Sequence, residues 1–142
     1  MRKIFKRTIC IIITAVLCLC VSACGNTTKK GDLWDSALYL EDTELGKGDK
    51  ELCVKVEAGD KTVTFIIHTD AETVGEALSE HKLISGEKGP YGMYVKTVNG
   101  ITADYDIDQS YWSFNKNGEY MQTGVDATSF ADGDSYELVY TK

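Results

Sequence analysis

The sequence has 142 residues, of which 43% are hydrophobic and 10% aromatic, so it can build one folded domain and is not a disordered chain. Of its 15 basic residues, four (Arg2, Lys3, Lys6 and Arg7) lie in the first 23 residues, which contain no acid, so 11 basic residues stand against 22 acidic ones in the rest. This acidic balance argues against nucleic acid as a partner and against docking on anionic lipid through a basic patch.

The N-terminus has the order of an export signal. A basic segment, Met1–Arg7, precedes an apolar run, Ile9–Val21, that is shorter than the roughly 20 residues of a membrane span. Small residues then precede a cysteine in Val21-Ser22-Ala23-Cys24-Gly25. This arrangement resembles a bacterial lipoprotein signal with its lipobox. The resemblance implies that residues 1–23 are a signal peptide and that Cys24 carries lipid, which anchors the chain on the extracytoplasmic side of the cell membrane. A plain secretory signal and a signal anchor are the alternatives.

The cysteines fit export without disulfides. Cys10, Cys18 and Cys20 fall in the signal and Cys24 is the expected lipidation site, which leaves Cys53 alone. One remaining cysteine can form neither an internal disulfide nor a C-x-x-C metal pair. Cys53 lies in a strand-like run, where we expect a buried small hydrophobic residue.

Residues 24–50 have the composition of a tether, rich in Thr, Lys, Gly, Asp and Glu without a sustained period. Trp34, Leu38, Tyr39 and Leu40 interrupt it. These apolar residues either form a short turn that packs on the domain or make an exposed site for a partner. The folded domain is expected at 51–142.

The domain opens with a predicted hairpin and a helix. Leu52–Glu57 and Thr62–His68 read as strands joined by a turn, because the second is rich in β-branched residues. Thr73 with Glu76 three residues later forms a capping box, and apolar residues at helical spacing predict a helix over 73–83. A loop containing the single proline is expected at 86–92.

The rest of the domain reads as strands. Asn-Gly turns, in which both residues tolerate positive φ, predict two more hairpins, and an alternating run predicts a last strand. The expected segments are 94–98 with 101–104, 111–115 with 119–122, and 135–141. One helix can cover one face of such a sheet. We therefore expect an α+β fold, a small two-layer β-grasp-like domain of mostly antiparallel sheet with one helix, in which the last strand returns beside the first.

From Thr62 to Lys142 the sequence resembles the small C-terminal β-domain of transcobalamin and intrinsic factor, and the bacterial domain-of-unknown-function family grouped with it. The motifs that carry the resemblance are short and occur in a fixed order. They are Thr73-Val74-Gly75-Glu76-Ala77-Leu78, Tyr94-Val95-Lys96-Thr97-Val98-Asn99-Gly100, Tyr111-Trp112, Asn117-Gly118-Glu119, Thr123-Gly124-Val125 and Asp132-Gly133-Asp134 leading into Tyr136-Glu137-Leu138.

In that family the β-domain closes over one face of cobalamin while a helical barrel holds the other, so the resemblance implies half of a corrinoid site. A corrinoid has an apolar ring with amide arms and suits aromatic faces with a few hydrogen-bonding groups. The positions that match the family's ligand face are Tyr91, Met93, Trp112, Phe114, Tyr120, Met121, Gln122, Gly124 and Val125. Trp112 and Phe114 share one face of their strand and belong either to the core of the sheet or to a binding surface.

Other chemistry is weakly indicated. Asp104, Asp106 and Asp108 resemble the start of a calcium loop, but Gln109 stands where its glycine belongs and Asn115 where its glutamate belongs. His68 or His81 could ligate the cobalt of a corrinoid, although capping or packing is the commoner role. The sequence has no nucleophile elbow, zinc signature or phosphate loop, so we expect no enzyme, no metal site and no cofactor other than cobalamin as a ligand.

Two functions follow. The first is a surface-anchored lipoprotein that binds a small ligand, such as cobalamin or another corrinoid, for delivery to a transporter. The alternative is a non-enzymatic module of the cell envelope that docks a partner protein through an exposed aromatic face and the segment 34–40.

Overall fold

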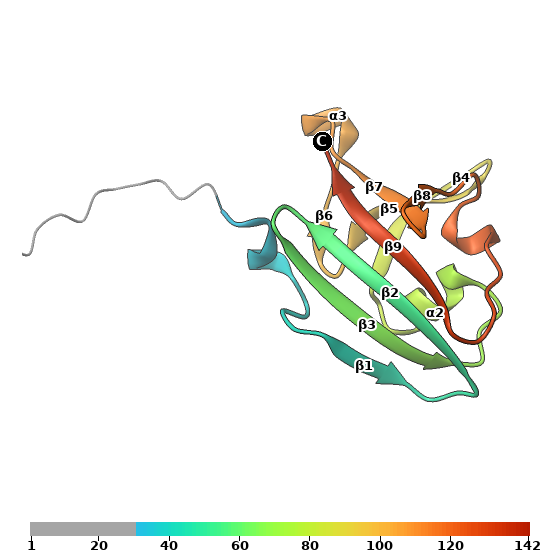
Figure 1. The fold of residues 1–142 in the computed structure, drawn as a ribbon. Coiled ribbons are helices and arrows are strands. Elements are labelled where there is room, and N and C mark those ends of the chain that lie inside the picture. Colours follow the sequence, from blue (N-terminus) through green and yellow to red (C-terminus); the bar gives the residue numbers. More distant parts are fainter. Residues whose placement is uncertain (1–30) are drawn as a thin grey trace, which may run out of the picture. The chain divides into compact units, whose positions relative to one another are not determined.

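Two long strands, β2 (Lys50–Ala58) and β3 (Lys61–Thr69), form the centre of the larger sheet in the computed structural model, which describes residues 31–142 (Figure 1). They pair antiparallel along their whole length, as the sequence predicts. Leu52, Val54 and Val56 are buried and alternate with half-buried residues, so one face of the sheet lies on the core. The expected signal peptide and Cys24 lie outside the described residues.

The larger sheet has six strands in the order β1-β3-β2-β9-β7-β8. Its remaining strands are β1 (Thr43–Gly46), β7 (Tyr111–Lys116), β8 (Glu119–Tyr120) and β9 (Asp134–Thr141). β9 pairs parallel with β2, which confirms that the last strand returns beside the first strand expected from the sequence. The same strand pairs antiparallel with β7, so β9 connects the two hairpins of this sheet.

A second, antiparallel sheet contains β4 (Ile84–Gly89), β5 (Gly92–Val98) and β6 (Ile101–Thr102). The loop expected at 86–92 is therefore wrong, because β4 pairs with β5 up to a tight turn at Pro90 and Tyr91. Every residue of β4 after Ile84 is exposed. A strand without a buried face has no alternating pattern, which explains why the sequence did not reveal it.

The main helix, α2 (Val74–Glu80), begins with the predicted capping box, in which Thr73 accepts from the Glu76 amide and Glu76 accepts from the Thr73 amide. The other helical segments are short: η1 (Leu33–Ser36), α3 (Tyr105–Asp108) and η2 (Val125–Ala127). Buried residues of α2 and of the second sheet join the covered face of the larger sheet in one core cluster. The α+β class and the mainly antiparallel pairing are thus confirmed, with the strands divided between two sheets.

Residues 31–50, expected as a tether, belong to the same compact unit as the rest of the described chain. Trp34 is buried, and its Nε1 donates to the Ala58 carbonyl at 2.8 Å. Tyr39 packs edge-on against Phe65 with ring centroids 5.5 Å apart. Of the two alternatives for this segment, packing on the domain holds for Trp34 and Tyr39, while Leu38 and Leu40 stay exposed.

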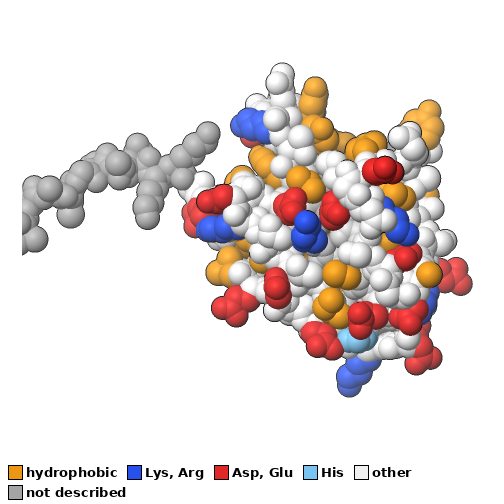
Figure 2. All heavy atoms as spheres, in the orientation of Figure 1, with side chains coloured by type: hydrophobic (Ala, Val, Ile, Leu, Met, Phe, Trp, Pro, Cys, Tyr) orange, Lys and Arg blue, Asp and Glu red, His pale blue; other side chains and the backbone are white. Residues whose placement is uncertain are grey.

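Both Asn-Gly turns adopt the predicted geometry, with positive φ at Asn99, Gly100, Asn117 and Gly118. On the face drawn in Figure 2, charged side chains of both signs cover the larger sheet, while hydrophobic side chains protrude at the upper edge, where Figure 1 places α3 and the β4–β5 hairpin. Within residues 31–142, no helix is long and apolar enough to cross a membrane.

Candidate functional site

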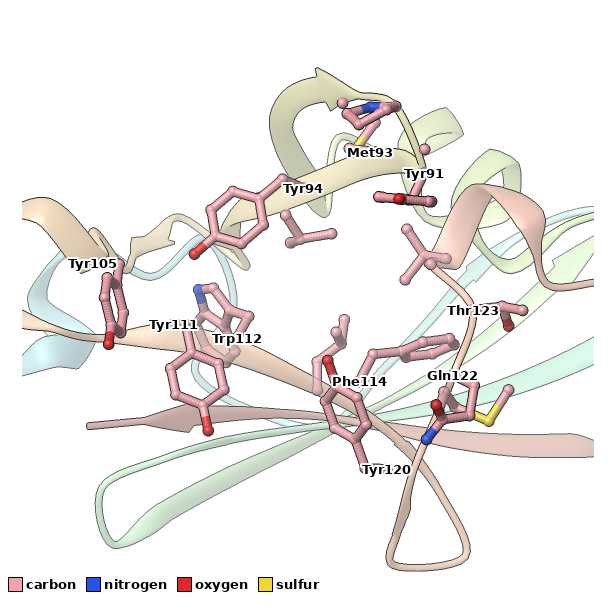
Figure 3. Close-up of a pocket in the computed structure, with 18 residues that line it drawn as sticks. Tyr91, Met93, Tyr94, Tyr105, Tyr111, Trp112, Phe114, Tyr120, Gln122 and Thr123 are labelled. Atoms are coloured by element: carbon pink, nitrogen blue, oxygen red, sulfur yellow. The ribbon is translucent and has the colours of Figure 1, made fainter.

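A cavity of about 670 Å³ lies between the two sheets at the β7–β8 side of the domain. One wall is the tip and return strand of the β4–β5 hairpin, residues 89–95. The opposite wall comes from β7 and from residues 120–125 after it, and Leu138 of β9 closes the base. Figure 3 shows Tyr94 of β5 and Trp112 of β7 facing each other across this pocket.

Trp112 and Phe114 form the floor of the pocket. They are 7% and 8% exposed and lie on the covered face of the larger sheet, so each is part of the core and also lines the cavity. Trp112 Nε1 donates to the Ile101 carbonyl at 3.2 Å, which ties the floor to the second sheet. Phe114 stacks on Tyr136 with ring centroids 5.4 Å apart. Core burial therefore holds for both residues, and their place in the cavity lining leaves the binding-surface alternative open.

A small polar cluster behind the floor fixes Tyr136. Lys116 Nζ lies 4.9 Å from the centre of its ring and 3.1 Å from Asp134 Oδ2. The Asp134 carboxylate, which also accepts from the Ala131 amide, raises the pKa of Lys116. The hydrogen bond from the Ala131 amide lowers the pKa of Asp134, and the nearby Lys116 ammonium lowers it further. Both groups stay charged near neutral pH, so the cluster holds the ring on which Phe114 stacks.

Five tyrosines form the rim of the pocket. Their exposed fractions are 91% for Tyr91, 47% for Tyr94, 56% for Tyr105, 36% for Tyr111 and 66% for Tyr120. An exposed tyrosine offers an apolar ring face together with a hydroxyl that both donates and accepts hydrogen bonds. The rim therefore suits a ligand with a flat apolar body and polar groups at its periphery.

Within residues 31–142, the lining of the pocket carries no charged side chain. Among the described residues that line it, none is Asp, Glu, Lys, Arg or His. Met93, Val95, Met121 and Val125 add apolar surface, and Gln122 and Thr123 add the only polar side chains besides the tyrosines. A pocket of this kind favours a neutral ligand, because a charged one would lose its hydration without gaining a counter-ion.

The structure brings together all nine positions expected from the sequence: Tyr91, Met93, Trp112, Phe114, Tyr120, Met121, Gln122, Gly124 and Val125 line this one pocket. That they bind a ligand stays a prediction. Sequence reasoning missed Tyr94, Tyr105 and Tyr111. Tyr94 follows Met93 directly in β5, where an aromatic residue beside a predicted site residue was the available signal.

The residues that the sequence offered as possible metal ligands do not line the pocket. Neither His68 nor His81 lines the pocket, so neither is placed to ligate a metal atom of a ligand there. Asp104 caps α3 by accepting from the Asp106 amide, and Asp108 pairs with Lys142 Nζ at 2.8 Å. Within the described chain, no group of three or more His, Cys, Asp and Glu side chains is placed to hold a metal ion. Cys53 is free and half-buried on the open face of β2, not buried as expected.

The fold and the pocket define a small α+β domain with an aromatic, uncharged cavity at one side of its sheets. Residues 71–142, half of the chain, match the family described as "Domain of unknown function (DUF4430)", and the chain belongs to this family. The expectation of a domain-of-unknown-function family is thereby confirmed. No curated protein was found that matches the sequence.

Two solved structures are similar. The first is a protein from Ruminococcus gnavus ATCC 29149, provisionally named a metal-binding protein, which is 39% identical with a TM-score of 0.63 over 66% of this chain and 98% of that chain. The second is haptocorrin in complex with Cbi, which is 16% identical with a TM-score of 0.56 over 69% of this chain. The match spans 26% of the haptocorrin chain, so the likeness is one of fold with a part of that protein.

Proposed function

We propose that this chain is a surface-anchored lipoprotein that binds a corrinoid and delivers it to a transporter. The observation that carries the proposal is the pocket itself: an uncharged cavity with an aromatic floor and a rim of five tyrosines. The acidic balance of the chain outside its first 23 residues further disfavours anionic ligands.

The chemistry of a corrinoid fits this lining. Its ring is flat and apolar and can lie against aromatic faces, while its amide arms can exchange hydrogen bonds with tyrosine hydroxyls and with Gln122 and Thr123. The volume of about 670 Å³ falls within the roughly 300–1,000 Å³ of small-molecule pockets. Because a corrinoid is larger than a drug-sized molecule, the pocket would cover one side of it and leave the other side open.

The likeness to haptocorrin supports the proposal at the level of the fold, since that structure holds Cbi. The part of haptocorrin without a counterpart here is the larger part of that chain. An exposed second ligand face is therefore available to another protein, and a transporter that accepts the ligand from this side is the partner we propose. Lipid on Cys24 would keep the domain at the outer side of the membrane for this transfer.

Metal-ion binding is the function that the name of the Ruminococcus gnavus protein would suggest. The pocket does not favour it, because its described lining offers no carboxylate, imidazole or thiolate, the usual ligands of metal ions in proteins. We propose an organic ligand that does not need such donors, and we propose binding without catalysis.

A second candidate is docking of a partner protein of the cell envelope. It is favoured by the exposure of Tyr91 (91%) and Ile107 (82%) beside the pocket, since large exposed apolar side chains are common at protein interfaces. In that case the tyrosine rim would bury an apolar side chain of the partner instead of a small molecule.

A calorimetric titration distinguishes corrinoid binding from docking of a partner protein. The chain from residue 24 with Cys24→Ser, which retains the whole compact unit of residues 31–142, is titrated calorimetrically with cyanocobalamin. Saturable one-to-one heat that decreases in Tyr120→Ala and persists in the exposed control Leu40→Ala would support corrinoid binding at the pocket. Absence of heat at two temperatures, up to the solubility limit of the ligand, would count against it and favour docking.

A further inference from the structure

The β4–β5 hairpin is a wall with little support of its own. It supplies residues 89–95 to the lining, yet Ser85–Gly89 of β4 are all exposed. The register shifts between Ser85 and Gly86, where a Cβ on Gly86 would lie 2.0 Å from the Tyr94 carbonyl oxygen. A hairpin with few buried contacts opens more easily than the core of its domain. Met93 and Val95 of β5 pack against the core, so a contact from outside the hairpin has its largest effect on the exposed tip beyond them.

One carboxylate from a distant part of the chain contacts this tip. Asp126 Oδ2 accepts a hydrogen bond from the Met93 amide at 2.9 Å, across 33 residues of sequence. Gly92 has φ of +105°, and a Cβ there would lie 2.3 Å from Asp126 Oδ1. The missing side chain of Gly92 thus makes room for the carboxylate beside the hairpin backbone.

The segment that carries Asp126 is held by burial and by hydrogen bonds to the start of α2. Its neighbour in η2, Val125, is 1% exposed. The Thr128 carbonyl accepts from the Val74 amide at 2.9 Å, and Thr128 Oγ1 donates to the Gly124 carbonyl at 2.8 Å, so the segment is tied to the start of α2. A Cβ on Gly75 would lie 2.8 Å from the Asp126 Cα, which shows how closely α2 approaches η2.

We propose that Asp126 is a positioning residue that holds the β4–β5 hairpin at the distance from β7 that the ligand requires. It acts through the Met93 amide and not through contact with the ligand, since Asp126 does not line the pocket while Met93 does. The inference rests on the proposed ligand-binding role of the pocket. Without this hydrogen bond the hairpin with Tyr91, Met93 and Tyr94 would sample open positions, and each binding event would have to order it again.

The test compares three variants of the chain from residue 24, each with Cys24→Ser. Asp126→Ala removes the acceptor, Asp126→Asn keeps an oxygen that accepts from the Met93 amide, and Asp60→Ala is a control for charge in the β2–β3 turn, away from the lining. Amide hydrogen exchange measured without ligand reports the hairpin directly, and titration with cyanocobalamin reports its effect on binding.

We expect faster exchange of the Met93 amide and a Kd raised about tenfold in Asp126→Ala, the loss typical of one hydrogen bond to a charged group. Asp126→Asn and Asp60→Ala should stay within about threefold of the parent, a difference of less than 1 kcal/mol. Should Asp126→Ala also unfold, Asp126→Ser replaces it as the variant without the carboxylate and should give the same two effects.

Unchanged exchange at Met93 in Asp126→Ala would overturn the inference, and so would an Asp126→Asn variant that binds as weakly as Asp126→Ala. If the parent chain binds no cyanocobalamin, the proposed function fails. The exchange measurement then still decides whether Asp126 positions the hairpin.

Discussion

Asn99 and Tyr39, 60 residues apart, are joined by two reciprocal hydrogen bonds. The Tyr39 amide donates to Asn99 Oδ1 at 2.9 Å, and Asn99 Nδ2 donates to the Tyr39 carbonyl at 2.8 Å. The Asn99 carbonyl also accepts from the Leu38 amide at 2.9 Å. Asn99 is fully buried. Its backbone forms the β5–β6 turn, and its side chain ties the segment around Tyr39 to the domain.

The first prediction follows from this pair. Asn99→Ala should lower the free energy of unfolding by about 2–4 kcal/mol, because it strains a residue with φ of 50° and leaves two backbone groups without partners. Asn117→Ala is the matched control: it has φ of 54° at the same turn position but is exposed, so we expect a loss of only about 1 kcal/mol. Urea denaturation measures both, and equal losses would contradict the role of the side-chain hydrogen bonds.

The second prediction concerns acid stability. Asp108 accepts from Lys142 Nζ and from Ser110, and these hydrogen bonds lower its pKa from 3.8 to about 2. A lowered pKa means that the folded state favours the ionised form, so the stabilisation is complete above about pH 4 and is lost as the pH falls toward 2. Asp108→Asn should melt slightly below the parent at neutral pH, and the difference should shrink as the pH falls from 4 to 2 and vanish below 2.

Thermal melts followed by circular dichroism over this pH range measure the effect. Asp106→Asn, on the same short helix, serves as the control for charge alone. A difference between Asp108→Asn and the parent that is as large at pH 2 as at neutral pH would show that the ionised carboxylate is not its cause.

The third prediction separates the ring of Tyr94 from its hydroxyl. Because the ring faces Trp112 across the pocket (Figure 3), Tyr94→Ala should weaken cyanocobalamin binding by about 1–2 kcal/mol, while Tyr94→Phe should keep most of the affinity. Ile107→Ala is the control for an exposed apolar residue that does not line the cavity. If Tyr94→Phe binds as poorly as Tyr94→Ala, a hydrogen bond and not the aromatic face makes the contact.

The fourth prediction concerns Gly75 in α2. Alanine favours a helix over glycine by about 1 kcal/mol, yet a Cβ here would meet the backbone of Asp126 at 2.8 Å. Overpacking against backbone costs about 1–3 kcal/mol, so Gly75→Ala should leave stability unchanged or lower and should displace η2. Ser79→Ala, on the exposed side of the same helix, should be neutral or slightly stabilising. A stabilised Gly75→Ala would mean that η2 moves away at no cost.

Local signals explain which parts of the fold could be predicted. The hairpins at Asn99-Gly100 and Asn117-Gly118 and the helix after Thr73 depend on residues close in sequence, and all three are present. β1 and β4 depend on pairing with distant or exposed neighbours, so neither has a pattern of its own.

The residues of the pocket also differ in how far the sequence could predict them. Trp112 and Phe114 could be named from their motifs and their shared strand face. Tyr105 of α3 lines the pocket together with residues of β5 and β7, and Asp126 of η2 contacts Met93 across 33 residues of sequence. These positions depend on tertiary packing, which no local period encodes.

The two edges of the larger sheet differ from its centre in length. β1 has four residues and β8 has two, whereas β2 and β3 have nine each. An edge strand exposes unpaired amides and carbonyls on which a further strand can assemble, and very short edges offer too few of them for stable addition. Chains crowded side by side at high density therefore have little means of joining their larger sheets through β1 or β8, although each displays a rim of exposed tyrosines.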